Sequence, residues 1–329
     1  GIHIHRVFAP VSTPEQSLAK RIFQHIQAKR QLSLVLNSID SDVIHFHDLD
    51  TAVISLFNKI SKPWIYDAHE DYSGMISDLA WPLPTVATLL ERYVVSKSDG
   101  IITVSPSIMK RLVSYGAKRR VMIFNSRTTE HFSSNVSPHE FRKELGIDSS
   151  KLVLLYIGSL GPGRSVMEAI DAVNSGDKNH LILGGHGMWA SKVSEAIRDS
   201  KNVTFLGTVP SDNLPKYFSI ADVILGMRDP GIPDHAISLP NKFFEAAAAR
   251  KPIIASSGTF VGELVLKHKL GKLADYGSVE SLLKSLDSLR DVELRMRCGD
   301  SGADLLSGKF GWKWQARKLN LLYNYLVKK

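Results

Sequence analysis

The sequence predicts an α/β protein made of two doubly wound domains. Short apolar runs alternate with helical segments, and the alternation starts again after a polar, irregular stretch that ends near Gly146. Strands that alternate with helices are typical of a parallel sheet covered by helices on both faces. We therefore expect two Rossmann-like domains, at residues 1–146 and 147–310, that face each other across a cleft.

The composition fits a globular chain of this size. Hydrophobic residues make up 43% and charged residues 22% of the 329 residues, which allows a sizeable core in each domain. The single cysteine, Cys298, excludes an internal disulfide and fits a reducing compartment. Because no membrane-spanning run and no secretory pattern is found, we expect a cytoplasmic protein.

The net charge of +8 favours an anionic partner, and most of the excess lies in residues 151–329. Nucleic acid is disfavoured, because the chain has no basic tract with interleaved aromatics, no zinc-finger spacing and no helix-turn-helix pattern. A phosphate-bearing small molecule is the better expectation.

Turn residues and apolar runs mark the elements of the first domain. They predict strands at 2–8, 42–47, 64–68, 100–104 and 121–124. Helices are expected to begin after Ser12 and after Ser105, to extend through Phe57, and to cover residues 84–96 and 138–145.

The second domain repeats the pattern. Strands are predicted at 152–157, 181–184, 203–206, 222–225 and 253–256, and helices at 166–173, 192–197, 213–220, 241–249 and near Leu264 and Leu282. The chain ends in a basic amphipathic stretch, 310–329, which contains aromatic residues and no acid.

One stretch of the second domain is suited to bind a phosphate. Pro240 precedes a helix for which Asn241 is the expected N-cap, and a buried strand at 253–256 follows this helix. Lys242 adds a positive charge beside the helix N-terminus, and Glu245 follows one turn later. These groups suit a nucleoside diphosphate and its ribose, although a capped, solvated helix end would give the same pattern.

Ligands of doubly wound sheets bind at the carboxyl ends of strands. In the first domain these ends carry the polar residues His45, His47, Asp48, His69, Glu70 and Ser105. In the second domain they carry glycine-containing loops at 158–164, 184–187 and Gly207. Two such sets suit a site for two substrates.

These motifs follow one another along the chain in the same order as in the retaining GT-B glycosyltransferases of family 4, group 1, which the chain therefore resembles. In the first domain the resemblance is carried by residues 44–50 and 65–70. In the second it is carried by 155–160, 184–187, 203–210, the Pro-Asn-Lys-Phe-Phe-Glu stretch at 240–245, and the ending from Phe310 onward. Members usually begin with a further strand and a glycine-rich loop before the equivalent of Gly1, so we expect a shortened N-terminal domain, which would reflect a trimmed chain, a reduced acceptor domain or a loss of activity.

The resemblance implies a role for several residues. Glu245 corresponds to the acid that binds the nucleotide ribose, and Lys242 and Arg164 to the cations that hold the diphosphate. His69 corresponds to the histidine that reaches the transferred sugar. The remaining donor-binding positions that it implies are Gly158, Val209, Pro240 and Asn241.

The same resemblance implies a metal-independent enzyme without a cofactor. The cations take the place of a metal on the leaving group. Asp48-Leu49-Asp50 resembles the Asp-x-Asp metal motif of the other large glycosyltransferase fold, but the doubly wound pattern argues against that fold. Two features depart from the family pattern: Ile237 replaces a frequent first glutamate, and Arg164 is the only cation of its loop.

We therefore expect a hexosyl or related transferase that acts on a glycan, lipid-linked or protein acceptor, for example in surface polysaccharide assembly. The stretch 311–329 is expected to pack back on the first domain, and its basic, aromatic character also suits an anionic membrane surface. The alternatives are a catalytically silent scaffold or partner subunit, or a sugar-nucleotide epimerase on the same architecture.

Overall fold

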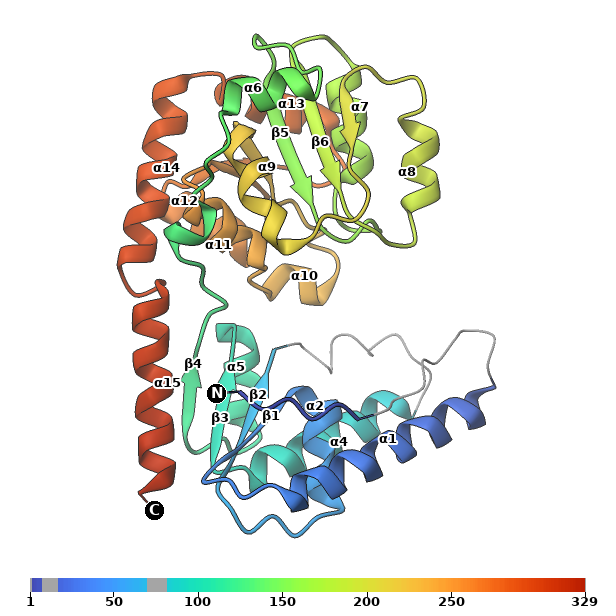
Figure 1. Cartoon of the computed structure of the whole chain (residues 1–329), viewed down its shortest axis with the longest axis vertical. Coiled ribbons are helices and arrows are strands. Elements are labelled where there is room, and N and C mark those ends of the chain that lie inside the picture. The colour runs from blue at the N-terminus through green and yellow to red at the C-terminus, as the bar shows by residue number, and fades with distance from the viewer. Residues whose placement is uncertain (1, 8–16, 70–81, 329) are drawn as a thin grey trace. The chain divides into compact units, whose positions relative to one another are not determined.

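The computed structural model describes residues 2–7, 17–69 and 82–328 and forms two compact units (Figure 1). Unit 1 contains residues 1–123 and 318–329, and unit 2 contains residues 124–317. The boundary thus lies before residue 124, whereas the sequence placed it after residue 146. The reason is that Phe124 stacks on Phe310 and Arg142 pairs with Asp222, so that the intervening residues pack inside unit 2.

Unit 1 is built on a parallel sheet of strand order β1-β2-β3-β4. Its described elements are α1 (Leu18–Ser38), β1 (Ile44–His47), α2 (Asp48–Ala52), the 3-10 helix η1 (Val53–Leu56), β2 (Trp64–Ala68), α4 (Leu83–Lys97), β3 (Gly100–Thr103), α5 (Pro106–Ser114) and β4 (Arg120–Met122).

The strand predicted at 2–8 is wrong for the described residues 2–7, which have no regular secondary structure. Ile2 and Ile4 are 93% and 75% exposed, so the alternating isoleucines find no sheet to pack on. Residues 12–16, where the next helix was expected to begin, lie outside the described residues. Helix α1 begins at Leu18, with Ser17 accepting a hydrogen bond from the Lys20 amide at 3.4 Å.

The end of the chain completes the core of unit 1. Helix α15 (Trp312–Val327) places Leu322 and Leu326 in one apolar cluster with Ile65, Ile102 and Ile123 of the sheet region. The side chains of Leu322 and Leu326 are 6% and 1% exposed. The packing expected for 311–329 is therefore present in the residues from Lys318 onward.

Unit 2 carries a parallel sheet of strand order β10-β9-β8-β5-β6-β7. Its strands are β5 (Leu152–Ile157), β6 (Asn179–Gly184), β7 (Val203–Phe205), β8 (Val223–Leu225), β9 (Ile253–Ser256) and β10 (Gly271–Ala274). Its other elements are η2 (Thr129–Phe132), α6 (Pro138–Glu144), α7 (Val166–Asn174), α8 (Ala190–Ala196), η3 (Ser211–Asn213), α9 (Leu214–Ile220), α10 (Pro233–Ile237), α11 (Asn241–Ala248), α12 (Phe260–Lys267), α13 (Val279–Ser288) and α14 (Val292–Ser307).

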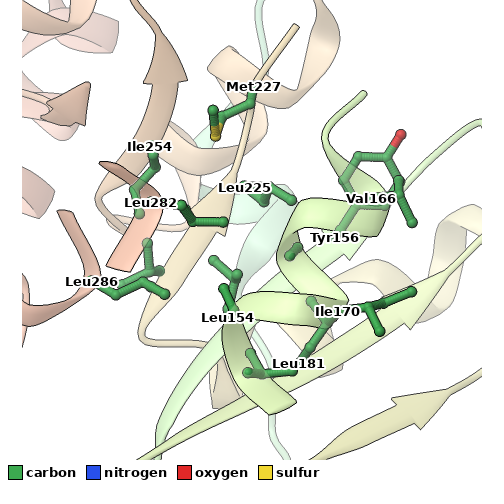
Figure 2. Packing of buried hydrophobic residues seen from close by; sticks show 14 of the residues in the cluster. Leu154, Tyr156, Val166, Ile170, Leu181, Leu225, Met227, Ile254, Leu282 and Leu286 are labelled. Atoms are coloured by element: carbon green, nitrogen blue, oxygen red, sulfur yellow. The ribbon is translucent and has the colours of Figure 1, made fainter. Parts of the chain in front are cut away.

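This order is that of a Rossmann sheet, because the chain builds outward from β5 first to one side and then to the other. The direction reverses between β5 and β8, which therefore flank the switch point. Figure 2 shows how Leu154 of β5 and Leu225 of β8 pack with Ile170 and Leu286 from the covering helices. This buried cluster holds the two strands in place beneath the switch point.

Among the strands and α-helices of unit 2, β10, α10 and α14 were not expected from the sequence. Helix α14 contains Gly299 and Gly302, which weaken helix propensity. Both glycines allow close packing, since a Cβ at Gly302 would lie 3.0 Å from the Ala247 Cα and one at Gly299 would lie 2.4 Å from the Arg250 carbonyl oxygen. None of the described helices is long and apolar enough to cross a membrane.

The packing of α15 leads to a stability prediction. Leu326→Ala should lower the free energy of unfolding of unit 1 by about 2–5 kcal/mol, because it leaves a cavity in the core. Leu321→Ala on the same helix is the matched control; Leu321 is 61% exposed and should change the value by less than about 1 kcal/mol. Denaturant unfolding of both variants measures the difference, and equal effects would contradict the placement of α15.

Candidate active site

A pocket of about 270 Å³ lies at the switch point of unit 2. It is lined by residues that follow β5 and β8 and by the start of α11: Tyr156, Ile157, Gly158, Ser159, Arg164, Gly226, Met227, Arg228, Pro240, Asn241, Lys242 and Glu245. Typical small-molecule sites have volumes of about 300–1,000 Å³, so this pocket suits part of a nucleotide sugar, such as its diphosphate.

The start of α11 differs by one residue from the sequence expectation. Pro240, rather than Asn241, is the N-cap residue, and it makes no side-chain capping hydrogen bond. Asn241 is the first helical residue and its side chain is exposed. The Phe243 N–H bonds the Pro240 carbonyl oxygen at 3.1 Å, and the N–H groups before it receive no cap from the Pro240 side chain, which leaves them able to bind an anion.

Lys242 connects α11 to the end of β5. Its Nζ donates a hydrogen bond to the Ile157 carbonyl oxygen at 2.9 Å and lies 3.5 Å from the centroid of the Tyr156 ring. Burial lowers the pKa of Lys242 to about 7, against the opposing attraction of Glu245 and with added repulsion from Arg164 and Arg228. A neighbouring anion would reverse this shift, because it favours the charged amine.

Two arginines add positive charge to the same pocket. Arg164 is partly buried and forms no hydrogen bond or ion pair with any residue in the described parts of the chain. Arg228, which the sequence analysis did not identify, bonds the Ser238 hydroxyl and lies 3.8 Å from an Asp234 carboxylate oxygen. The position of Arg228 in the loop that follows β8, after Gly226 and Met227, is the signal that could have identified it.

Glu245 is the acid of this pocket. Its side chain is 13% exposed and its carboxylate lies 3.9 Å from the Arg127 guanidinium. Burial raises the pKa of Glu245, although Lys242 and Arg127 oppose the shift. The carboxylate thus interacts electrostatically with two cations and can accept hydrogen bonds from a ligand.

Glycine loops bring the backbone close to the pocket. Gly158 follows β5, and a Cβ there would lie 3.3 Å from the Lys242 Nζ. Gly185 has a φ of +141°, and a Cβ on it would lie 1.8 Å from the Gly158 carbonyl oxygen. Val209, by contrast, lies against Gly184 and is not among the residues that line the pocket.

Other cavities lack this combination of groups. A larger one, of about 800 Å³, lies in unit 1 between β4 and α15 and is rich in cations, among them Lys118, Arg119, Arg120 and Lys318. It lies at the edge of the sheet and not at a strand carboxyl end. For this reason we place the candidate donor site at the pocket of about 270 Å³ at the switch point of unit 2.

In unit 1 the strand ends carry a histidine cluster. The Oδ2 atom of Asp67 lies 3.1 Å from His45 Nε2, 3.2 Å from His69 Nε2 and 3.6 Å from His47 Nδ1. His47 Nδ1 also lies 3.0 Å from His69 Nε2. His45, read from the sequence as a strand residue, does lie in β1, but its ring takes part in this cluster.

Charge in the cluster is concentrated on Asp67. Burial raises the pKa of Asp67, but the hydrogen bonds from His45 and His69 outweigh this effect and lower the pKa to about 2. The pKa of His47 is lowered by burial and by repulsion from the neighbouring histidines. The carboxylate is therefore ionised at neutral pH.

The remaining strand-end residues have structural contacts. The Asp48 carboxylate accepts a hydrogen bond from the His69 amide at 2.9 Å, and the Ser105 hydroxyl caps α5 by accepting from the Ile108 amide at 3.3 Å. Glu70 lies outside the described residues. Among the described residues, the groups that could hold a metal ion are His45, His47 and Asp67, whose ligand atoms lie within 4.8 Å of one another.

Two family models match the sequence. One, described as glycosyl transferases group 1, covers residues 138–304, and one described as glycosyltransferase family 4 covers residues 3–126. An uncharacterized glycosyltransferase of Methanocaldococcus jannaschii is 25% identical over 293 residues, which is 84% of this chain and 72% of that protein. A GDP-mannose-dependent phosphatidylinositol monomannoside mannosyltransferase of Mycobacterium tuberculosis is 28% identical over 144 residues, which is 42% of this chain and 37% of that protein.

Solved structures share the fold. A sucrose-phosphate synthase from Thermosynechococcus elongatus superposes with a TM-score of 0.79 at 17% identity, over 98% of this chain and 83% of that one. The Anabaena HepE protein in complex with UDP and glucose gives a TM-score of 0.74 at 15% identity, over 92% of this chain and 82% of that one. The fold is therefore that of the GT-B glycosyltransferases, as the sequence predicted.

Proposed function

Because this chain belongs to the group 1 family of glycosyltransferases, we propose that it transfers a hexose or related sugar from a nucleoside diphosphate sugar with retention of configuration. The acceptor we propose is a glycan, a lipid-linked saccharide or a protein. The observation that carries the proposal is the pocket at the switch point, which joins Arg164, Lys242 and Glu245 to a helix start whose N-cap residue makes no side-chain capping hydrogen bond.

The charges of the pocket match the parts of such a donor. When the bond between the sugar and the diphosphate breaks, negative charge grows on the departing phosphate oxygens. Arg164 and Lys242 are placed to stabilise this charge, together with the first N–H groups of α11. Glu245 can accept hydrogen bonds from the ribose hydroxyls.

We propose that these cations make a metal ion unnecessary for the transfer. Two cationic side chains and a helix N-terminus can supply the positive charge that a metal supplies elsewhere. Among the described residues that line the pocket of unit 2, Glu245 is the only acid. A single carboxylate is a poor ligand set for a hard divalent cation.

His69 is the residue that we propose contacts the transferred sugar or the acceptor hydroxyl. It follows β2 at the carboxyl end of the unit 1 sheet, where ligands of parallel sheets bind. A neutral imidazole there can accept a hydroxyl proton or a hydrogen bond.

We further propose that the enzyme works in the cytoplasm at an anionic membrane surface. The basic cavity between β4 and α15 supports this location, because Lys118, Arg119 and Lys318 gather beside the exposed Leu321. Cations next to exposed apolar side chains favour anionic lipid headgroups.

Nucleotide binding tests the donor pocket. Calorimetry with UDP, GDP and ADP should show binding of at least one. Glu245→Ala should weaken that binding about 10- to 100-fold, as for the loss of hydrogen bonds to a charged group. Glu263→Ala is the control, since Glu263 is an exposed acid in the first turn of α12. Absence of binding by all three nucleotides would refute the proposed donor site.

The pH dependence of this binding tests Lys242. Only the charged amine attracts the diphosphate, and its pKa of about 7 in the free protein should rise when the nucleotide binds. Affinity should therefore change little between about pH 6 and pH 7 and fall by up to about tenfold per pH unit above pH 7. Nucleotide phosphates are already ionised there, since their second pKa is about 6.

Lys242→Arg provides the control for the pH experiment, because guanidinium stays charged throughout. The variant should bind with little dependence on pH. Calorimetric dissociation constants for both proteins measure the slopes, and an unchanged slope in the variant would show that another group titrates.

The metal requirement is tested by transfer assays with excess chelator. Activity of the purified chain should stay within about twofold of the untreated value, because the charge on the leaving diphosphate is neutralised by side chains. Loss of activity that added Mg²⁺ or Mn²⁺ restores would argue for a metal-dependent transfer.

A further inference from the structure

A second cavity of unit 2 lies beside the donor pocket. It has a volume of about 510 Å³ and is lined by Trp312, by the four consecutive residues 125–128, and by His131 and Asn241. Asn241 also lines the pocket of about 270 Å³ at the switch point, so the two cavities meet at the start of α11. A molecule in the second cavity would therefore lie next to the diphosphate that we propose for the first.

The chain segment that forms one wall of this cavity is fixed by the residue before it. The Phe124 ring stacks on Phe310, with ring centroids 5.0 Å apart, and its centroid lies 6.0 Å from that of Phe244 in α11. The Phe124 amide donates a hydrogen bond to Gln315 Oε1 at 3.2 Å, and Gln315 is buried in α15. The wall is therefore attached to both α11 and α15.

The lining combines one aromatic ring with several neutral polar groups. Trp312, the first residue of α15, is 45% exposed, so part of its ring is open to a ligand. Asn125 and Asn241 supply amides that form no hydrogen bond with residues in the described parts of the chain, and residues 126 and 128 supply hydroxyls. This combination suits a saccharide, which presents C–H groups on the faces of its ring and hydroxyls at the edge.

The charge of the lining favours an anionic substituent on this saccharide. Arg127 and His131 are the basic residues of the cavity, and none of the described residues that line it is an acid. The Arg127 guanidinium lies 3.9 Å from a Glu245 carboxylate oxygen, which is beyond hydrogen-bond distance, and its side chain is 41% exposed. Arg127 can therefore donate paired hydrogen bonds to a carboxylate or phosphate of a ligand.

A saccharide fits this cavity better than the flat base of a nucleotide does. Sites for such groups are lined mainly by apolar and aromatic side chains. Among the described residues that line this cavity, Trp312 is the only aromatic residue apart from His131, and the others are polar or charged. Asn125, His131 and Asn241 are also exposed, so a ligand that is rich in hydroxyl groups would keep contact with water here.

We propose that this cavity binds a saccharide unit of the acceptor that carries a carboxylate or a phosphate. Trp312 is the platform for the sugar ring, and Arg127 selects the anionic group. Asn241, at the junction of the two cavities, is placed to contact both donor and acceptor. The inference rests on the proposed function, because that function gives the bound saccharide its role as acceptor.

Indole N–H signals in NMR spectra test the cavity directly. The full chain, labelled with nitrogen-15 at tryptophan, is titrated with D-glucuronate, and the Trp312 signal is assigned from Trp312→Phe. This signal should move with a dissociation constant of about a millimolar, which is typical of so small a ligand. Trp314 is the control, because it is also 45% exposed on α15 but is not among the residues that line the cavity. Its signal should stay in place.

Variants separate the aromatic part of the site from the charged part, and ligand-observed NMR measures their affinities. Trp312→Ala should weaken glucuronate binding at least about tenfold, and Trp314→Ala should change it less than about twofold. Trp312→Phe, which keeps an aromatic ring, should lose less than Trp312→Ala. Arg127→Gln should reduce the preference for glucuronate over D-glucose about three- to tenfold, because it removes a charge-assisted hydrogen bond. Circular dichroism establishes that each variant is folded.

Three results would overturn the inference. The first is a Trp312 signal that does not move at about 20 mM glucuronate, well above the expected constant. The second is an equal movement with acetate at the same ionic strength, which would indicate a simple anion site. The third is competition between UDP and glucuronate, which would indicate that the cavity takes part of the nucleotide.

Failure of the proposed function gives a different result. If UDP, GDP and ADP all fail to bind, the donor site is refuted. The Trp312 signal would still report whether the saccharide cavity is occupied, since glucuronate contains no nucleotide.

Discussion

The contact of the Lys242 ammonium with the end of β5 is the interaction on which the donor pocket depends. It brings the start of α11 to the switch point. The amine there contacts the Ile157 carbonyl oxygen and the Tyr156 ring, and neither group carries a full negative charge. Arg164 and Arg228 add to the positive field. Burial and the repulsion from these arginines lower the Lys242 pKa in the free protein, and an anionic ligand would oppose this shift because it favours the charged amine.

Unit 1 places the opposite charge in the equivalent position of its own sheet. Asp67 is a buried carboxylate at the carboxyl end of β2, and histidine rings surround it, whereas the pocket of unit 2 is lined by cations. Both arrangements follow from the same geometry, since parallel strands bring their ends to one edge where helix starts and loops meet. A negative cluster suits hydrogen bonding to hydroxyl groups, and a positive one suits phosphates.

Much of this organisation was predictable from the sequence. The rest depends on contacts between residues far apart in the chain, which a local sequence pattern does not show. The strands at 64–68, 152–157 and 253–256 were placed at their observed bounds, because apolar runs between turn residues are a strong signal. Arg164, Lys242 and Glu245, which the resemblance joined in one site, line the same pocket. The N-cap was misplaced by one residue, since Pro240 and Asn241 are both acceptable there. Asp67 and Tyr323 were missed because their partners are distant in sequence, 278 residues apart in the case of Tyr323 and His45.

Helix α15 shows how packing and chemistry are joined in this chain. Leu319, Leu322, Tyr323 and Leu326 repeat at three- and four-residue intervals and so lie on one face, against the core of unit 1. The two leucines at 322 and 326 supply apolar burial, and between them Tyr323 delivers a hydroxyl to His45. The opposite face exposes Leu321 and Tyr325 beside a basic cavity. The expectations that the C-terminal stretch packs on the first domain and that it meets an anionic surface thus concern two different faces of one helix, and the inward face also reaches His45, which hydrogen-bonds Asp67.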